Sequence, residues 1–168
     1  MGKQALGFDF GTSNCTVSIF DSDKGVVETL PISNYSESKK RSLANQSLFP
    51  SKVGLNDDFE YVFGDETKKC ERDFVWDNSK RLLEHNTPIY RGGVLKKPIW
   101  VAIGIMAGIY KELKNLSVKT SSPMVITVPA NSYSTQRSLT RLAAESFSFN
   151  VDQLVSEPCA AALGCYEY

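Results

Sequence analysis

Residues 5–20 read ALGFDFGTSNCTVSIF, and this stretch decides the fold. Residues 5–10 are mainly apolar, and residues 15–20 alternate in polarity and are rich in β-formers, as strands are. Residues 11–14 (Gly-Thr-Ser-Asn) between them are turn formers. The stretch therefore predicts a β-hairpin, which a further strand over residues 26–32 extends into an antiparallel meander.

The hydrophobic period changes to that of helices further along the chain. Residues 65–73 and 77–84 favour helix, and Pro98 stands where the first turn of a helix accepts proline. Apolar residues then recur at helical spacing as far as Leu116. Residues 123–128 are a continuous apolar run, which is typical of a buried central strand.

The end of the chain completes a strand–helix–strand–helix unit. Residues 133–147 predict a helix, residues 151–155 a strand and residues 159–166 a second helix. The crossover between parallel strands is expected to be right-handed. Meander and crossover together predict an α/β fold, a mixed five-stranded sheet flanked by helices.

Shorter segments are expected between the meander and the long helix. Residues 33–46 are polar and rich in serine, so they predict a mobile loop. Short strands are expected over residues 47–55, interrupted by Pro50, and over residues 60–63. A brief connection is expected at residues 88–93, where one proline and two glycines interrupt the pattern.

Composition limits the possible partners. The 168 residues hold 19 basic and 19 acidic side chains, a net charge of zero. A nucleic acid or a membrane surface is therefore not expected as a partner, because both require clustered basic residues. A phosphate ligand would have to be bound by local groups.

The cysteines and the apolar segments indicate a cytoplasmic protein. The four cysteines show no C-x-x-C pair and no metal-ligand spacing with His85. Residues 1–30 lack a secretory signal pattern. The longest apolar run, residues 99–110, is shorter than the roughly 20 residues of a membrane-spanning helix. We expect free thiols and no membrane anchor.

Asp9 is an ionisable residue placed between two phenylalanines at the end of a strand. Backbone N–H groups of the turn that follows can form an anion-binding concavity, and a carboxylate beside it can hold Mg²⁺ through water. The segment is not a Walker loop, because it lacks the G-K-S/T signature and leads into a strand. A simple hairpin with a polar tip explains the same residues equally well.

Other candidate residues have ordinary explanations when each is taken alone. Lys68, Lys80 and Arg81 are typical of solvated helix faces. Glu157 ends a predicted strand of an α/β sheet, which is where ligands usually bind. None of these residues identifies a reaction by itself.

Several sequence blocks together resemble the heat shock protein 70 (DnaK-type) chaperones, in order and in spacing, over nearly the whole chain. The blocks are Gly7-Phe8-Asp9-Phe10-Gly11-Thr12-Ser13-Asn14, Gly64-Asp65-Glu66-Thr67-Lys68, Lys80-Arg81-Leu82, Val125-Ile126-Thr127-Val128-Pro129-Ala130, Gln136-Arg137 and Glu157-Pro158-Cys159-Ala160-Ala161-Ala162-Leu163. A single glycine-turn hairpin would be weak support, whereas blocks in register are strong support.

The resemblance implies an actin-like (ribonuclease H-like) ATPase lobe that binds ATP and Mg²⁺. The implied phosphate contacts are Gly11, Thr12, Ser13 and Asn14, and the implied carboxylate of the hydrated Mg²⁺ site is Asp9.

The resemblance also implies which residues act on the nucleotide. Lys68 would face the γ-phosphate and the attacking water, and Glu157 would orient water and metal-bound water. Pro129 and Arg137 would relay the nucleotide state to a peptide-binding domain. In the family, ATP hydrolysis is coupled to the binding and release of unfolded peptide clients, with co-chaperones, in protein folding and the stress response.

The chain departs from the family pattern in two places. The stretch from Leu83 to Pro98 is shorter than in the family, so the upper subdomain, about residues 33–97, is expected to be reduced. Residues 1–168 are expected to form the first lobe of the nucleotide-binding domain, without the second lobe or the peptide-binding domain. We therefore expect negligible ATP hydrolysis by this chain alone.

Three alternatives remain open at this point. An actin-like cytoskeletal protein shares the hairpin, although residues 128–130 and 157–158 fit the chaperones better. A sugar kinase of the same superfamily would need a substrate-binding aspartate, for which no candidate stands out. A non-hydrolysing chaperone-like regulator is disfavoured by the presence of both Lys68 and Glu157.

Overall fold

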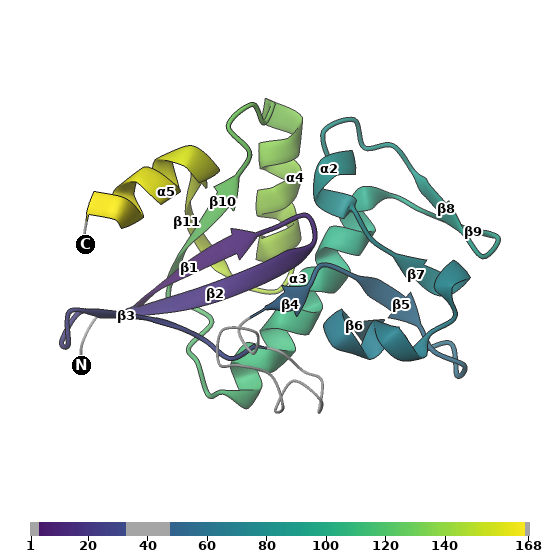
Figure 1. Cartoon of the computed structure of the whole chain (residues 1–168), viewed down its shortest axis with the longest axis horizontal. Helices are drawn as coiled ribbons and strands as arrows, with labels where there is room; N and C mark the ends of the chain where they lie inside the picture. The colour runs from purple at the N-terminus through teal and green to yellow at the C-terminus, as the bar shows by residue number, and fades with distance from the viewer. Residues whose placement is uncertain (1–3, 33–47, 167–168) are drawn as a thin grey trace.

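The computed structural model of the chain describes residues 4–32 and 48–166, so the loop predicted at residues 33–46 lies outside the described residues. Within those residues, one six-stranded sheet has the order β11-β10-β1-β2-β3, and β4 pairs with β2 (Figure 1). Its strands are β1 (Gln4–Phe10), β2 (Asn14–Asp21), β3 (Val26–Thr29), β4 (Phe49–Pro50), β10 (Pro123–Val128) and β11 (Asn150–Ser156).

The sheet is mixed, as the sequence predicts. β1, β2 and β3 form the antiparallel meander, whereas β10 runs parallel to β1 and β11 runs parallel to β10. The five predicted strands are all present, and the short β4 adds a sixth. The prediction of a mixed sheet flanked by helices is confirmed.

Alternation along β1 separates the core from the opposite face of the sheet. Leu6, Phe8 and Phe10 are buried, whereas Gly7 and Asp9 are exposed. Successive side chains of a strand point to opposite faces, so Asp9 points away from the core that its two neighbours enter. The acidic residue within an apolar segment therefore breaks no packing rule.

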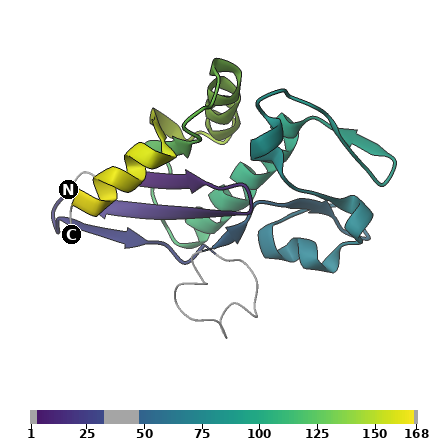
Figure 2. The same ribbon diagram turned by 45° about the horizontal axis from the view of Figure 1, so that its top comes forward.

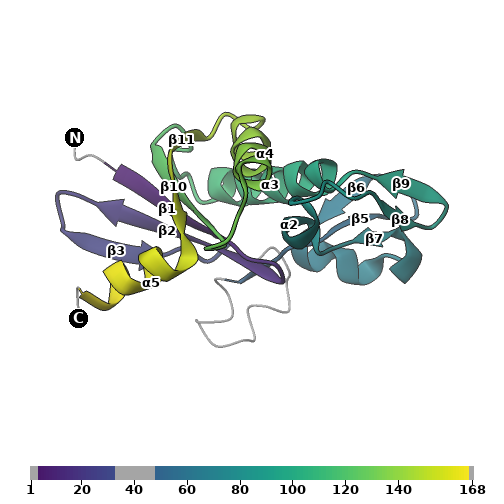
Figure 3. The ribbon, with the colours of Figure 1, turned by 90° about the horizontal axis from the view of Figure 1, so that it is seen from above.

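Helices lie on both faces of the main sheet. α3 (Pro98–Asn115) packs against α4 (Ser134–Glu145) on one face, and α5 (Glu157–Tyr166) lies on the other (Figure 3). The core side of α3 follows the predicted helical spacing. Its buried apolar residues are Val101, Ala102, Ile105, Met106, Ile109 and Leu113.

Two small sheets lie to one side of the main sheet (Figures 1 and 2). One contains β5 (Val53–Leu55), β6 (Tyr61–Phe63) and β7 (Val75–Trp76), and the other contains β8 (Ile89–Arg91) and β9 (Val94–Lys96). Three short helical segments connect them: the 3₁₀ helices η2 (Gly64–Lys69) and η3 (Arg72–Phe74), and α2 (Ser79–Leu82). That residues 33–97 form a distinct upper subdomain remains a prediction.

Two predictions for this region were wrong. Residues 65–73 were expected to be helical throughout, but the chain forms 3₁₀ turns there, with Cys70 extended. Residues 88–93 were expected to be a simple connection, but they belong to the β8–β9 hairpin. Gly92 and Gly93 both have positive φ, which two-residue hairpin turns of type I′ require.

Candidate functional site

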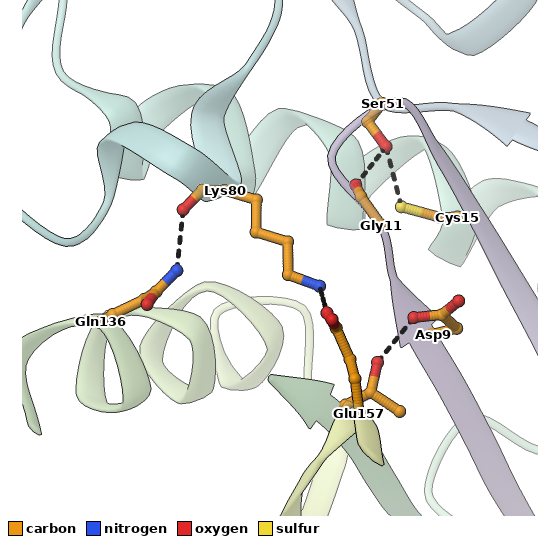
Figure 4. Close-up of polar contacts among 8 residues, drawn as sticks. Asp9, Gly11, Cys15, Ser51, Lys80, Gln136 and Glu157 are labelled. Carbon is orange, nitrogen blue, oxygen red and sulfur yellow. Dashed lines mark hydrogen bonds and ion pairs between the residues drawn. The ribbon is translucent and has the colours of Figure 1, made fainter. Parts of the chain in front are cut away.

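The turn between β1 and β2 is held in place by β4 and the residue after it. Gly11 accepts a hydrogen bond at its carbonyl oxygen from Ser51 Oγ (2.7 Å), and Ser51 N donates to the Ser13 carbonyl (2.9 Å). A Cβ on Gly11 would lie 2.0 Å from the Asn14 carbonyl oxygen, so the turn requires glycine. Figure 4 shows the hydrogen bond from Ser51 to the Gly11 carbonyl oxygen, which attaches the turn to the residue after β4.

A buried thiol supports the base of the same turn. Cys15 Sγ lies 3.2 Å from Ser51 Oγ. Burial raises the pKa of Cys15 to about 12, despite the hydrogen bond between Cys15 and Ser51, which lowers the pKa. The thiol is therefore neutral near pH 7 and acts as a packing group.

The turn forms one wall of a polar cavity of about 440 Å³. Thr12, Ser13 and Asn14 of the turn line it together with Lys68 of η2. The remaining lining residues are Pro50, Ser51, Lys52, Gly64, Asp65, Thr67, Asp77 and Asn78. The fold therefore brings the predicted lysine into the same cavity as three of the four predicted phosphate contacts.

Lys68 is positioned by its own 3₁₀ turn. Its Nζ lies 2.7 Å from Oδ1 of Asp65, whose side chain is buried, whereas Lys68 is 45% exposed. Thr67 Oγ1 donates to the Gly64 carbonyl (2.7 Å), which tightens the turn. Gly64 has φ +59, and a Cβ there would meet the Phe49 ring at 2.8 Å. Glycine at residue 64 thus sets where η2 begins.

A second polar cluster joins residues of β1, β10, α2 and α5. Thr127 Oγ1 of β10 donates to Asp9 Oδ1 (2.6 Å). Glu157, at the start of α5, accepts from Lys80 Nζ (2.5 Å). Figure 4 shows the Asp9 carboxylate near the Lys80–Glu157 pair. These residues come from four distant segments of the chain.

Lys80 is the residue that sequence reasoning misjudged. It was expected on a solvated helix face, but its side chain is only 4% exposed. Its ammonium lies 5.7 Å from the centre of the Phe10 ring, and its backbone carbonyl accepts from Gln136 Nε2 (2.9 Å). Leu83, three residues further on, is also buried, but a helix of four residues is too short for this spacing to predict a buried lysine from the sequence.

Comparison with known proteins gives relatives of this chain at the level of sequence. No protein-family model matches the chain. Among curated proteins, the chain is 29% identical over 167 residues to the chaperone protein DnaK of Mycoplasmopsis agalactiae, covering 97% of this chain and 26% of that protein. Its curated homologues are DnaK (heat shock protein 70) chaperones.

Two further DnaK proteins give the same result. The chain is 28% identical to DnaK of Mycoplasmopsis pulmonis over 161 residues and to DnaK of Mesomycoplasma hyopneumoniae over 160 residues. Each match covers 94% of this chain and 24% of the relative. The chain therefore spans about a quarter of the DnaK relatives it matches, and the resemblance seen in its motifs is confirmed as a match to a DnaK-type fragment.

The residues predicted from the DnaK resemblance occupy three places. Thr12, Ser13, Asn14 and Lys68 line the polar cavity, and Gly11 forms the turn behind it. Asp9 and Glu157 belong to the Lys80 cluster, and neither is among the residues that line that cavity. Pro129 follows β10, and Arg137 donates to the Leu154 carbonyl of β11 (2.9 Å). Their assigned roles remain predictions.

The residues of the two clusters are compatible with a Mg²⁺ ion held through water and with a phosphate held mainly by neutral donors. Among the described residues, no group of three or more His, Cys, Asp or Glu side chains is placed to hold a metal ion. Asp9 alone suits Mg²⁺ held through water, because Mg²⁺ retains several waters in most sites. Two lysines and two aspartates line the polar cavity, so a phosphate bound there would depend largely on hydroxyl, amide and backbone donors.

A separate apolar cavity of about 480 Å³ lies between α3 and the small sheets. It holds none of the residues predicted from the DnaK resemblance, and Lys96 is the one charged residue among the described residues that line it. We therefore place the candidate chemistry at the polar cavity. Within residues 4–32 and 48–166, no helix is long and apolar enough to cross a lipid bilayer.

Proposed function

We propose that this chain is the first, phosphate-binding lobe of the ATPase domain of a heat shock protein 70-type chaperone, with an actin-like fold. One observation carries the proposal: the turn residues Thr12, Ser13 and Asn14 share a polar cavity with Lys68, more than 50 positions away. The DnaK homologues support the family, and the order β11-β10-β1-β2-β3 of a meander and a crossover supports the fold.

The residues of the polar cavity would bind and orient a triphosphate. Hydroxyl and backbone donors of the turn suit phosphate oxygens, and the Lys68 ammonium suits the charge that develops on a transferred phosphoryl group. ATP bound there supplies the bond that is cleaved. Phosphoryl transfer requires positioning and charge stabilisation, so a covalent nucleophile is not needed.

Asp9 and Glu157 of the Lys80 cluster would hold the hydrated metal and orient the water. The Asp9 oxygen that does not accept from Thr127 is available for water bound to Mg²⁺. Glu157 is 46% exposed, so its carboxylate can also orient water. Lys80 donates a hydrogen bond to one carboxylate oxygen of Glu157, which limits the directions in which the other oxygen can point.

The 168-residue chain by itself should bind ATP weakly and hydrolyse it negligibly. A ligand cleft normally buries about 70–90% of its ligand, and the polar cavity provides one wall of such a cleft. The complete protein would couple ATP hydrolysis to the binding and release of unfolded peptides in the cytoplasm, with co-chaperones. Pro129 and Arg137 are the proposed relay residues.

NMR titration of the ¹⁵N-labelled chain with Mg-ATP tests this function. We expect weak, saturable shifts at residues 11–14 and in η2, which Lys68→Ala reduces and Lys69→Ala leaves intact. Lys69 is a matched control, because it is exposed, adjacent and outside the polar cavity. Shifts confined to the apolar cavity, or equal effects of the two variants, would contradict the proposal. Turnover by the chain alone that Lys68→Ala abolishes would contradict the prediction of negligible hydrolysis.

A further inference from the structure

A second, basic cavity of about 320 Å³ adjoins the polar cavity. Four residues line both: Lys52, Thr67, Lys68 and Asp77. The other lining residues of the basic cavity, which do not line the polar cavity, are Cys70, Arg72, Val75 and Arg91. The two cavities are therefore neighbouring parts of one hollow, with Lys68 at their boundary.

The basic cavity concentrates positive charge in a chain whose net charge is zero. Four cationic side chains and one carboxylate, that of Asp77, line it. Among residues 4–32 and 48–166, no ion pair engages Lys52, Arg72 or Arg91. Clustered charges of one sign in a concave surface raise the local concentration of counter-ions. The cavity is thus suited to an anion.

The cations reach the basic cavity from separate segments. Lys52 lies between β4 and β5, Arg72 begins η3, and Arg91 ends β8. Two of the three are arginines, whose planar guanidinium groups bind carboxylate and phosphate oxygens in pairs. The three cations are not neighbours in the sequence, so the fold itself brings them to one cavity.

The one ionisable thiol in the basic cavity adds no negative charge. Burial raises the pKa of Cys70, and the charge of Asp57 raises it further. The thiol is therefore neutral near pH 7, and the carboxylate of Asp77 is the only negative group among the described lining residues.

We propose that the cavity bounded by Lys52, Arg72 and Arg91 is a second oxyanion subsite, which takes a phosphoryl group beside the polar cavity. The anion is either the terminal part of a nucleotide held in the polar cavity or a separate phosphate. Only the first source rests on the proposed function. The subsite itself rests on the charges and shape of the cavity.

Calorimetric titration of the 168-residue chain with pyrophosphate, without nucleotide, tests the subsite. We expect saturable binding that weakens between 50 mM and 200 mM salt. Arg72→Gln and Arg91→Gln should each weaken it about 10-fold, the effect of losing one charge-assisted hydrogen-bonded contact. Arg91→Lys keeps the charge but not the paired donors, so it should give an intermediate loss. Arg81→Gln is the control and should change the affinity by less than about 2-fold, because Arg81 is exposed and lines neither cavity.

Competition with Mg-ATP then identifies the source of the phosphoryl group. If ATP displaces pyrophosphate and both arginine variants weaken ATP, the subsite holds the nucleotide's terminal phosphate. If pyrophosphate binds alongside ATP, the subsite takes a separate anion. Both outcomes support the subsite.

Two results would overturn it: no pyrophosphate binding by the parent chain, or binding that Arg72→Gln and Arg91→Gln leave unchanged although both variants melt like the parent chain. The proposed function can fail independently. In that case Lys68→Ala and Lys69→Ala act alike on ATP, while pyrophosphate binding still depends on Arg91.

Discussion

The Lys80–Glu157 pair predicts an asymmetry between two charge-removing substitutions. The Lys80 side chain is 4% exposed, whereas that of Glu157 is 46% exposed. Glu157→Gln leaves a buried ammonium without its counter-charge. Lys80→Met removes that ammonium, keeps an unbranched stem in its place, and leaves a carboxylate that water can reach. Glu157→Gln should therefore destabilise the fold more.

The magnitude follows from burial. Removing one partner of a fully buried pair costs about 3–5 kcal/mol, because the other charge is left uncompensated. Half-exposure of Glu157 reduces this figure through solvent screening, so we expect about 2 kcal/mol for Glu157→Gln. Lys80→Met should cost less than about 1 kcal/mol, because apolar replacements of buried charges are often neutral. The hydrogen bond from Gln136 survives it, since the acceptor is the Lys80 backbone carbonyl.

Urea unfolding of the 168-residue chain, followed by circular dichroism, measures both changes if the m values stay equal. The exposed Arg141–Glu145 pair provides the control, and Glu145→Gln should change stability by less than about 0.5 kcal/mol. A Lys80→Met variant that is as unstable as Glu157→Gln, or less stable, would refute the reasoning. The double variant should be close to Lys80→Met, because no buried charge then remains to be paired.

Three further predictions concern the β1–β2 turn. Gly11→Ala should destabilise the chain by at least about 2 kcal/mol in thermal melts and abolish the ATP-induced NMR shifts, because the added Cβ would overlap the Asn14 carbonyl. Gly7→Ala is the control: residue 7 has open space around it, so its stability should lie within about 1 kcal/mol of that of the parent chain. Cys15, with a pKa of about 12, should resist a thiol reagent at pH 8 that labels exposed Cys159, and labelling of both at equal rates would contradict its burial. Because the Cys15 pKa is raised on folding from 9.0, its contribution to stability should be complete below pH 9 and should fall as the pH rises from 9 towards 12.

The long, strongly periodic elements were predictable from the sequence. The helix expected from Pro98 to Leu116 is α3, and the apolar run at 123–128 is β10. Their burial patterns depend on neighbours within a few positions, so sequence spacing contains the necessary information. The same is true of the β1–β2 hairpin, whose two strands are joined by a short turn.

The short elements were harder to predict because their partners are distant. β7 has two residues and exists by pairing with β5, more than 20 positions earlier. Lys80 lies in a four-residue helix, where no periodicity can distinguish a buried face from a solvated one. Its partner Glu157 is 77 positions away, and only the folded chain brings the two charges together.

The β1–β2 hairpin contributes residues to both polar clusters. Asp9 and the residues of the turn stand at opposite sides of Gly11, whose carbonyl is fixed by Ser51. Thr12, Ser13 and Asn14 after Gly11 line the polar cavity, whereas Asp9 before it accepts a hydrogen bond from Thr127. Lys68 of η2 lines the polar cavity, and Lys80 of α2 pairs with Glu157 of α5, so each polar cluster includes a lysine from a segment distant in the sequence. Because a Cβ at residue 11 would overlap the Asn14 carbonyl, the proposed phosphate contacts of the turn depend on this glycine.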